Sequence, residues 1–207
     1  MEKVMAEEKI FIENGKLIIE ALQHKSASSQ GVIICHPHPL MGGSMYNNVV
    51  EAIVRAFAAI DLTTLRFNFR GVGASTGSYD EGRGETQDII SVYEYLKKEG
   101  LSQIYFAGYS FGAWVGAKLL EEKENIFSHT TLISPPDNHY AFNINNLKNV
   151  VDLIICGDAD DYCQIKNIKS QLKDVKTAVE IISGADHFYS GKEKELEKIL
   201  RKYLEKA

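Results

Sequence analysis

Residues 104–116 read Ile-Tyr-Phe-Ala-Gly-Tyr-Ser-Phe-Gly-Ala-Trp-Val-Gly, and this stretch predicts a strand, a sharp turn and a helix in direct succession. A short apolar run rich in aromatic residues ends in the motif Gly-x-Ser-x-Gly, whose serine is Ser110. Gly108 and Gly112 carry no side chain at the two positions where such a turn brings the backbone close to itself. We therefore expect Ser110 at the tip of a nucleophile elbow, with its hydroxyl pushed out of the sheet.

The helix expected after Ser110 begins at Phe111 and points free N–H groups toward the place where charge would develop on a substrate oxygen. The motif alone is only moderately specific. Its plain alternative is a glycine-rich turn between a strand and a helix, with a solvent-exposed serine that does no chemistry. The aromatic strand before the motif and the helical spacing of small and apolar residues after it favour the elbow.

The composition is that of an ordinary globular domain: of 207 residues, 44% are hydrophobic and 25% are charged. We expect a single domain over residues 1–207. The net charge of −5, without a cluster of Lys and Arg, argues against nucleic acid or an anionic membrane as a partner. Residues 1–9 lack the apolar core of a signal peptide, and no apolar run approaches the roughly 18 residues of a membrane span. These observations predict a cytoplasmic protein, and a homodimer is compatible with them.

The three cysteines fit a reducing compartment, because an odd number cannot all be paired within one chain. Cys35 and Cys156 end apolar, strand-like runs and are expected to be reduced core residues. Cys163 lies in a segment where it could be exposed, and no neighbouring residue marks it as reactive.

Strands alternate with helices along the chain. Asn14-Gly15 is a strong hairpin signal, so residues 9–13 and 16–22 are expected to open the domain as an antiparallel pair. Further strands are predicted at residues 31–35, 63–69, 104–109, 129–134, 151–156 and 178–182, and helices at 47–60, 85–98, from 111 onward, at 164–172 and at the amphipathic C-terminus around 196–204. This order predicts the α/β class, with a mostly parallel sheet covered by helices on both faces.

Sites in such a sheet form at the carboxyl ends of the strands, which narrows the search for a base that could activate Ser110. His24 lies in the hairpin, and His129 begins a strand and so faces the other edge of the sheet. His36 and His38 lie at the correct edge but precede the serine, whereas hydrolases built on this elbow place the histidine after it.

His139 and His187 remain as candidates for the base. His187 follows a predicted strand in the segment Ser-Gly-Ala-Asp-His-Phe at 183–188, a short loop that can return an imidazole to the elbow. His139 lies in a longer connection rich in proline and asparagine and is the weaker candidate. The base needs an acid to hold its tautomer, and Gly157-Asp158-Ala159-Asp160-Asp161 offers three carboxylates at the end of strand 151–156.

The serine motif, the spacing Gly157-x-x-Asp160 and the segment Gly184-x-Asp186-His187 together resemble the α/β-hydrolase superfamily over most of the chain. Three longer segments are similar to the small cap-less bacterial α/β hydrolases, which are related to dienelactone-hydrolase-like and serine-aminopeptidase-like enzymes. These segments are Cys-His-Pro-His-Pro-Leu-Met-Gly-Gly-Ser at 35–44, Arg-Phe-Asn-Phe-Arg-Gly-Val-Gly at 66–73 and Gly-Ala-Asp-His-Phe at 184–188. The resemblance implies an α/β-hydrolase fold without a cap domain.

By this resemblance Ser110 matches the nucleophile of a catalytic triad, and His187 matches the base. Asp160, rather than Asp158 or Asp161, matches the acid. The three residues follow one another in the order Ser, Asp, His that the resemblance requires.

The resemblance also implies an oxyanion hole built from two N–H groups. One belongs to Phe111, directly after the nucleophile. The other comes from the loop after the first parallel strand, which here reads His-Pro-His-Pro at 36–39 where many relatives have His-Gly. Because proline has no N–H, the second donor is expected to be His38, with Leu40 as the fallback. His36 is expected to hold the loop by a structural hydrogen bond rather than to act as a second base.

Nothing in the sequence predicts a metal or a cofactor. Neither a Cys-x-x-Cys pair nor two histidines and a glutamate at metal-binding spacing occur. Arg70-Gly71-Val72-Gly73 is expected to be a structural turn, because it lacks the last glycine and the acidic residue of a dinucleotide fingerprint. Residues 134–149, where relatives often insert a helical cap, form a short loop, so the site should be open and weakly selective.

The expected function is that of a serine hydrolase that cleaves a small carboxylic ester through an acyl-enzyme on Ser110. The same residues would serve a thioesterase or an aminoacyl peptidase. A non-catalytic member of the fold that binds a partner or ligand is the alternative from another class. Trp114 and the tyrosines at 46, 109, 140 and 162 could line the substrate pocket, although an aromatic residue on a core helix, such as Trp114, is more often packing.

Overall fold

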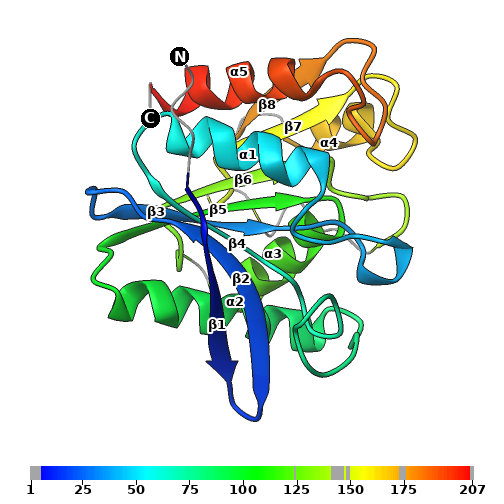
Figure 1. The fold of residues 1–207 in the computed structure, drawn as a ribbon. Coiled ribbons are helices and arrows are strands. Elements are labelled where there is room, and N and C mark those ends of the chain that lie inside the picture. Colours follow the sequence, from blue (N-terminus) through cyan, green and yellow to red (C-terminus); the bar gives the residue numbers. More distant parts are fainter. Residues whose placement is uncertain (1–5, 124, 141–146, 148–149, 173–175, 206–207) are drawn as a thin grey trace.

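The computed structural model describes residues 6–123, 125–140, 147, 150–172 and 176–205. Within these residues, eight strands form one sheet in the order β1-β2-β4-β3-β5-β6-β7-β8 (Figure 1). The strands are β1 (Glu8–Asn14), β2 (Leu17–His24), β3 (Gln30–Cys35), β4 (Thr63–Phe67), β5 (Gln103–Tyr109), β6 (His129–Ile133), β7 (Leu153–Gly157) and β8 (Ala178–Ile182). The predicted α/β class is therefore confirmed.

The sheet is antiparallel at one edge and parallel elsewhere. β1 pairs with β2 around the Asn14–Gly15 turn, where Gly15 adopts a φ of 59° that glycine tolerates without strain. β2 also runs antiparallel to β4, whereas every pair from β4 to β8 is parallel. The predicted N-terminal hairpin and mostly parallel sheet are thus both present. β4 ends at Phe67 rather than at residue 69, because the chain turns there into the loop that follows.

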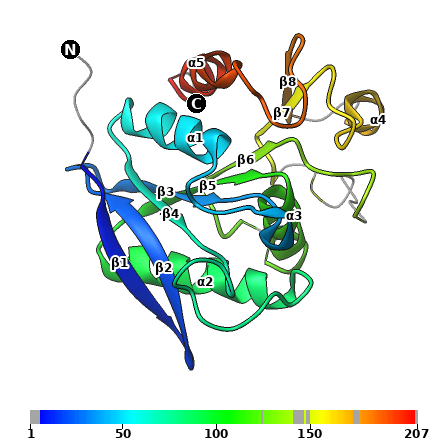
Figure 2. The ribbon, with the colours of Figure 1, turned by 45° about the vertical axis from the view of Figure 1, so that its right-hand side comes forward.

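Helices cover both faces of the sheet. α1 (Asn48–Ala58) and α5 (Glu193–Leu204) lie together on one face, and α2 (Arg83–Lys98) and α3 (Phe111–Glu122) lie on the other (Figures 1 and 2). Two shorter elements, η1 (Pro39–Met41) and α4 (Ile165–Gln171), complete the described helices. The apolar stripe of each long helix faces the strands, which is the pattern that the sequence predicts.

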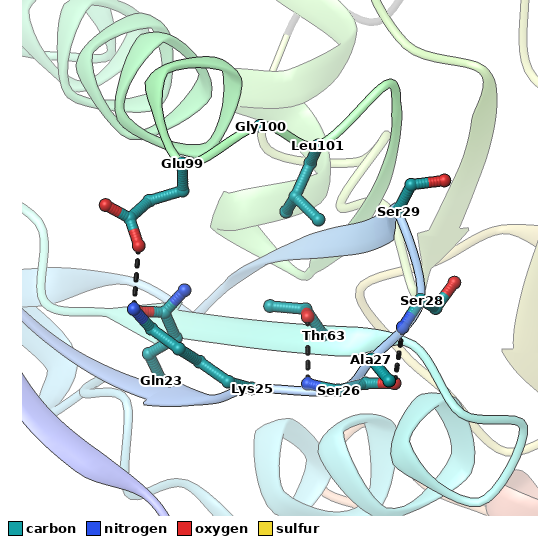
Figure 3. Close-up of a pocket in the computed structure, with 10 residues that line it drawn as sticks. All are labelled: Gln23, Lys25, Ser26, Ala27, Ser28, Ser29, Thr63, Glu99, Gly100 and Leu101. Atoms are coloured by element: carbon teal, nitrogen blue, oxygen red, sulfur yellow. Dashed lines mark hydrogen bonds and ion pairs between the residues drawn. The ribbon is translucent and has the colours of Figure 1, made fainter.

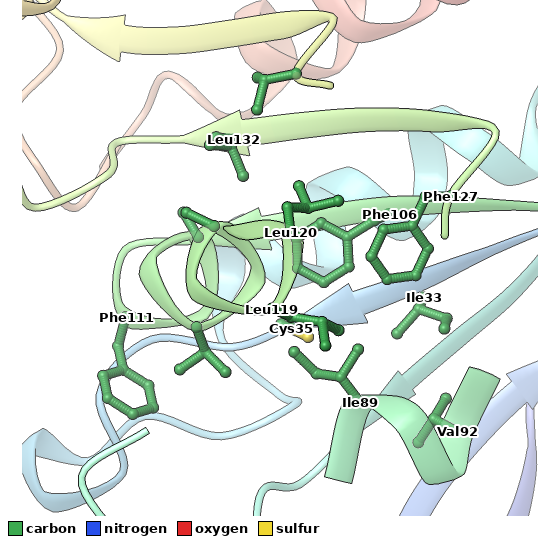
Figure 4. Packing of buried hydrophobic residues seen from close by; sticks show 14 of the residues in the cluster. Ile33, Cys35, Ile89, Val92, Phe106, Phe111, Leu119, Leu120, Phe127 and Leu132 are labelled. Atoms are coloured by element: carbon green, nitrogen blue, oxygen red, sulfur yellow. The ribbon is translucent and has the colours of Figure 1, made fainter. Parts of the chain in front are cut away.

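Each face of the sheet has its own hydrophobic core. The core under α2 and α3 contains aromatic side chains from β5 and α3, and Figure 4 shows Phe106 of β5 beside Phe127 and Leu120. The core under α1 and α5 combines Val, Ile, Leu and Ala side chains with the fully buried rings of Phe57, Tyr109 and Tyr189. Ser110 is the residue directly before α3, and α3 packs on the first of these cores. Buried side chains therefore support the elbow.

The connection from β6 to β7 spans residues 134–152, and its described residues form no cap domain. Of the loop that the sequence predicts in this region, residues 141–146 and 148–149 lie outside the described residues. Among the described helices, none has both the length and the apolar character needed to cross a bilayer.

A buried ion pair joins the turn after β4 to α2. Asp88 is fully buried, and its carboxylate accepts hydrogen bonds from the guanidinium of Arg70 at 2.7 Å and from the Arg70 backbone N–H at 3.0 Å. Asn14 at the hairpin tip donates to the same carboxylate at 2.7 Å. Gly71 and Gly73 follow with positive φ values of 77° and 57°, so this glycine-rich segment is a structural turn.

We predict that Asp88→Asn lowers the free energy of unfolding by about 3 kcal/mol, because Arg70 then keeps its charge in a largely buried place without a carboxylate. Urea unfolding followed by circular dichroism measures the change. Glu94→Gln, an exposed charge removal on the same helix, is the matched control and should stay within about 0.5 kcal/mol of the wild type. Equal stability of the two variants would contradict the structural role of the pair.

Candidate active site

The turn between β5 and α3 is as sharp as the sequence predicts. Ser110 has φ 54° and ψ −118°, a conformation that is rare for residues other than glycine. A Cβ atom at Gly108 would lie 2.6 Å from the carbonyl oxygen of Gly112, and one at Gly112 would lie 2.7 Å from that of Cys35. The Ser110 N–H donates to the carbonyl of Ile133 on the neighbouring strand at 2.9 Å. The serine is therefore held in this strained conformation by its surroundings.

Ser110, His187 and Asp160 form one hydrogen-bonded series. His187 lies in the loop after β8, and its Nε2 is 2.9 Å from the Ser110 hydroxyl oxygen. Its Nδ1 is 3.0 Å from each carboxylate oxygen of Asp160, which lies in the loop after β7. A carboxylate accepts hydrogen bonds, so Nδ1 carries the proton and Nε2 is free to accept that of the serine. Each of the three residues is less than a tenth exposed.

The loop after β7 holds Asp160 by several donors. Besides His187, the backbone N–H groups of Tyr162 and Cys163 donate to its Oδ1 at 2.8 and 3.0 Å. Burial pushes the pKa of Asp160 upward, but the hydrogen bonds from His187, Ser134 and Tyr162 outweigh it and hold the pKa below its ordinary value. The carboxylate is thus ionised at neutral pH, as an acceptor from an imidazole requires.

The two neighbouring carboxylates lie elsewhere. Asp158 accepts hydrogen bonds from the hydroxyl of Ser183 at 3.0 Å and from the N–H of Gly184 at 2.6 Å, and so ties the loop after β7 to the loop after β8. Asp161 is exposed, and its carbonyl accepts a hydrogen bond from the side chain of Asn138. Of the three acids, only Asp160 reaches the imidazole.

Cys156 and Cys163 form a disulfide, and the prediction that Cys156 is reduced is wrong. Cys163 is also buried rather than exposed. The bond joins the end of β7 to the residue after Tyr162, so it closes the loop that carries Asp160. The sequence carried no signal for it, because the odd cysteine count and the seven-residue separation fit no framework. Cys35 is a buried free thiol, as predicted, and burial raises its pKa well above the ordinary value.

His36 has the structural role that the sequence suggests. It is fully buried, its Nε2 accepts the N–H of Phe69 at 3.0 Å, and its Nδ1 donates to the carbonyl of Pro37 at 2.6 Å. Burial lowers its pKa to about 4, so the imidazole stays neutral. His129 lies at the opposite edge of the sheet beside Asp152.

His139 is an exposed residue that reaches the site only indirectly. Its ring stacks on that of Tyr162 with 4.9 Å between centroids, and Tyr162 in turn lies 4.5 Å from the ring of His187. Ser110 is therefore paired with His187, and His139 has no contact with the serine.

The loop after β3 brings His38 beside the start of α3. Its ring lies 4.8 Å from that of Phe111, and its Nδ1 accepts the N–H of Leu40 at 3.1 Å. The N–H of Leu40 is therefore occupied. Within the part of the chain that the structure describes, the N–H groups of His38 and Phe111 donate to no protein acceptor. They are the two donors that the sequence analysis named first for an oxyanion hole.

Residues at the end of β4 hold this loop from beneath. The guanidinium of Arg66 donates to the carbonyl of Met45 at 2.9 Å, and the side-chain oxygen of Asn68 accepts the Met45 N–H at 2.9 Å. The Asn68 amide in turn donates to Glu20 at 2.8 Å. The Arg-Phe-Asn-Phe-Arg segment, which the sequence analysis used only as a family signature, is thus the support of the His38 loop.

Aromatic side chains gather around Phe111. The ring of Tyr140 stacks on that of Trp114 with 4.4 Å between centroids, and Tyr79 lies 5.8 Å from Phe111. Trp114 occupies the place that a side chain at Gly82 would need. Trp114 is half-buried, so it is both packing and part of the surface beside the elbow. Tyr46 is remote from this cluster and lies under the guanidinium of Arg66.

Three residues near Ser110, Asp160 and His187 have contacts that the sequence analysis did not anticipate. The hydroxyl of Tyr109 donates to the carbonyl of His187 at 2.6 Å, and the hydroxyls of Ser134 and Tyr189 lie 2.7 Å apart. All three side chains are buried. Tyr109 was named only as a pocket candidate, and its burial excludes that role. Ser134 could have been suspected because it ends a strand at the edge of the sheet that carries the site.

A surface pocket of about 330 Å³ lies away from these residues (Figure 3). It is lined by residues that precede β3 and β5 and by the first residue of β4, so it opens at the opposite edge of the sheet. Its most prominent interaction is a Lys25–Glu99 ion pair at 2.7 Å. Among the described residues, no group of His, Cys, Asp and Glu is arranged to hold a metal ion.

The sequence and the fold are similar to those of known proteins. The family described as alpha/beta hydrolase fold matches residues 32–187. Uncharacterized protein RP471 of Rickettsia prowazekii (strain Madrid E) is 34% identical over 200 residues, which cover 90% of this chain and 84% of the relative. The chain therefore belongs to the α/β-hydrolase family.

Solved structures extend the likeness to nearly the whole chain. An alpha-beta serine hydrolase homologue from Coxiella burnetii is 33% identical with a TM-score of 0.86, over 98% of this chain and all of that one. XC6422 from Xanthomonas campestris, described as an a/b serine hydrolase without lid, is 26% identical with a TM-score of 0.86, over 99% of this chain and 96% of that one. The predicted cap-less α/β hydrolase is confirmed, and these likenesses support a hydrolase.

Proposed function

We propose that this protein is a serine hydrolase that cleaves small carboxylic esters through an acyl-enzyme on Ser110. The observation that carries the proposal is the series Ser110–His187–Asp160, with 2.9 Å from hydroxyl to imidazole and 3.0 Å from imidazole to carboxylate. A serine hydroxyl needs a base in contact with it to become a nucleophile, and the base needs an acid to fix its tautomer. The serine also begins α3, whose N–H groups favour negative charge.

In the first half of the reaction, the Ser110 oxygen attacks the ester carbonyl while Nε2 of His187 takes its proton. The N–H groups of Phe111 and His38 stabilise the oxyanion of the tetrahedral intermediate. The intermediate collapses, and His187 returns the proton to the departing alcohol. In the second half, His187 removes a proton from water, whose oxygen attacks the acyl-enzyme carbonyl. The second tetrahedral intermediate then collapses, and His187 returns the proton to the Ser110 oxygen as the carboxylic acid is released. Asp160 stays ionised and stabilises the imidazolium throughout.

Esters are the proposed class because the fold has no cap to enclose a particular acyl group and an alcohol leaves more readily than an amine. The same residues would cleave a thioester or an aminoacyl amide, and a panel of the three classes distinguishes them. The expected cytoplasmic location, the homodimer and the absence of nucleic-acid and membrane partners stay predictions.

The first test is covalent labelling. A fluorophosphonate probe should label the wild type at Ser110, and Ser110→Ala should lose both labelling and ester hydrolysis, because Ser110 is the serine, among the described residues, whose hydroxyl lies within hydrogen-bond distance of an imidazole. Ser170→Ala, at an exposed serine of α4, is the matched control and should keep both. A folded wild type that takes no label and hydrolyses none of the three substrate classes would favour the non-catalytic binding protein.

The second test asks which acid works. Asp160→Asn should lower kcat by about 10⁴-fold, the effect that the same change has in serine proteases, because the amide favours the wrong tautomer of His187. Asp158→Asn is a matched control in the same loop. It weakens contacts to Ser183 and Gly184 only, so it should lower kcat less than about tenfold. The reverse order of severity would contradict the assignment of Asp160.

The third test concerns the His38 loop. A side chain at Gly43 would collide with the carbonyl oxygen of Pro37 and lie 2.7 Å from that of His38, so Gly43→Val must displace the proposed donor. We expect kcat to fall at least about 100-fold, the loss that follows removal of one oxyanion donor. His38→Ala keeps the backbone N–H and should retain substantial activity, and a chelator should have no effect. Loss of activity on chelation, restored by zinc, would contradict this role.

A further inference from the structure

An exposed aromatic ring lies beside the imidazole of His187. Phe188 directly follows His187 and is 58% exposed, whereas His187 and Tyr189 on either side of it are buried. Single exposed apolar residues are common on protein surfaces, so exposure alone assigns no role to this ring. A role follows from the way its backbone is held and from the chemistry that takes place next to it.

The backbone of Phe188 is fixed by a donor and an acceptor. Its N–H donates to the carboxylate of Asp186 at 3.0 Å, and its carbonyl accepts a hydrogen bond from the side chain of Asn48 at 3.1 Å. Asn48 is the first residue of α1, so this bond ties the loop after β8 to a helix that packs on the sheet. Tyr189 follows with φ 55°, a value that is rare for a large side chain and persists only where the surrounding structure imposes it. The fold therefore fixes the point from which the Phe188 ring projects.

Among the described residues, three aromatic rings lie next to the imidazole of His187. Tyr109 has its ring centroid 5.5 Å away, and its side chain is buried. Tyr162 has its centroid 4.5 Å away, is half-buried and carries the ring of His139 stacked on it at 4.9 Å. Phe188 has its centroid 5.8 Å away, with an angle of 85° between the ring planes. Of the three rings, that of Phe188 is the one most open to a molecule that arrives from solvent.

The proton transfer of the proposed reaction brings the alcohol part of the ester to His187. When the first tetrahedral intermediate collapses, the bond between the carbonyl carbon and the alcohol oxygen breaks, and its electron pair goes to that oxygen. The same oxygen takes the proton that Nε2 of His187 received from Ser110. It must therefore lie within hydrogen-bond distance, about 3 Å, of Nε2. A phenyl group carried next to that oxygen can meet the Phe188 ring at the centroid separation of about 4.5–7 Å that aromatic pairs favour.

We propose that Phe188 is a specificity-determining residue, whose ring contacts the leaving alcohol and selects esters of uncharged apolar or aromatic alcohols. The inference rests on the proposed function, because it names the substrate class of the same reaction. Other groups, the N–H groups of His38 and Phe111, are proposed to hold the oxyanion. The Phe188 ring therefore acts on the alcohol and not on the carbonyl oxygen.

Carboxylates around Phe188 restrict the alcohol to an uncharged one. Asp186, which accepts the Phe188 N–H, is exposed. Glu193 accepts a hydrogen bond at 2.9 Å from Asn48, through the same nitrogen that binds the Phe188 carbonyl. That hydrogen bond is the main cause that lowers the pKa of Glu193 below its ordinary value, so Glu193 is ionised at neutral pH. The neighbouring cation, Lys192, is paired with a carboxylate of α5 at 3.4 Å. An alcohol with a negative charge of its own should therefore be disfavoured.

The test uses three acetate esters, which all form the same acetyl-enzyme on Ser110. Benzyl acetate brings a ring to Phe188, ethyl acetate is too short to do so, and para-carboxybenzyl acetate adds a negative charge to the ring. The value of kcat/KM reports the steps through acylation and so responds to the alcohol, whereas hydrolysis of the shared acetyl-enzyme does not. A displaced His187 would slow all three esters, so a loss confined to the ring-bearing alcohols identifies contact with Phe188.

Two substitutions at Phe188 are compared with a matched control. Phe188→Ser removes the ring, and Phe188→Leu keeps an apolar side chain. Phe11→Ser is the control, because Phe11 lies on the N-terminal hairpin and is 57% exposed, nearly the same as Phe188. Circular dichroism and fluorophosphonate labelling of each variant show whether it is folded and whether Ser110 is still reactive. The preference of the wild type among the three esters is a second measurement that needs no variant.

The wild type should have a kcat/KM for benzyl acetate at least about tenfold above that for ethyl acetate, the factor that partial burial of a phenyl ring and one contact between rings supply. Para-carboxybenzyl acetate should be about fivefold poorer than benzyl acetate, the effect of two like charges about 4 Å apart in water. Phe188→Ser should lower kcat/KM for benzyl acetate about tenfold and for ethyl acetate less than about twofold. Phe188→Leu should lie between Phe188→Ser and the wild type, and Phe11→Ser should match the wild type.

An active wild type that does not prefer benzyl acetate would overturn the inference. So would a Phe188→Ser variant that behaves like Phe11→Ser or that slows all three esters equally. Equal values for benzyl and para-carboxybenzyl acetate would overturn the restriction to uncharged alcohols. A wild type that neither takes the fluorophosphonate label nor hydrolyses any ester would instead contradict the proposed function itself.

Discussion

The close approach of three backbone segments at the end of β5 is the constraint on which the rest of the site depends. β5 ends, α3 begins and β3 passes within a space that has no room for a Cβ atom at Gly108 or Gly112. Ser110 is thereby forced to a positive φ, and its hydroxyl leaves the plane of the sheet at the start of a helix. The same contact draws the loop after β3 against α3, which is why His38 and Phe111 are neighbours.

Most of the fold could be predicted from the sequence, because its elements depend on short-range chemistry. The Asn14–Gly15 turn predicts the hairpin, and β8 lies at residues 178–182 in both the prediction and the structure. The strands that alternate with helices leave few arrangements other than a parallel sheet. The bounds of β4 and β7 differ by about two residues, because they depend on where neighbouring strands stop pairing, and no residue type marks that point.

The candidate site could be predicted only in part. Ser110 and His187 follow from a motif and from chain order, but Asp160 was preferred to Asp158 by resemblance alone. In the structure the difference lies in the path of a loop, which brings one carboxylate to the imidazole and the other to a neighbouring turn. The contact between Ser134 and Tyr189 joins residues far apart in sequence, and neither serine nor tyrosine signals a positive φ. The Cys156–Cys163 bond escaped prediction for a similar reason, since it depends on loop geometry rather than on cysteine spacing.

Ser110 and His187 follow strands that differ in how many neighbouring strands pair with them. Ser110 follows β5, which is paired on both sides, whereas His187 follows β8, the last strand, which is paired only with β7 and buries only Ile182. Local unfolding begins where backbone pairing and apolar contacts are fewest. Opening of this edge would carry the imidazole away, together with the buried side chains of Ala185 and Tyr189, while the serine elbow and the core under α2 and α3 stayed folded. The contact between the imidazole and the serine therefore depends on an edge strand, whereas the serine conformation depends on the middle of the sheet.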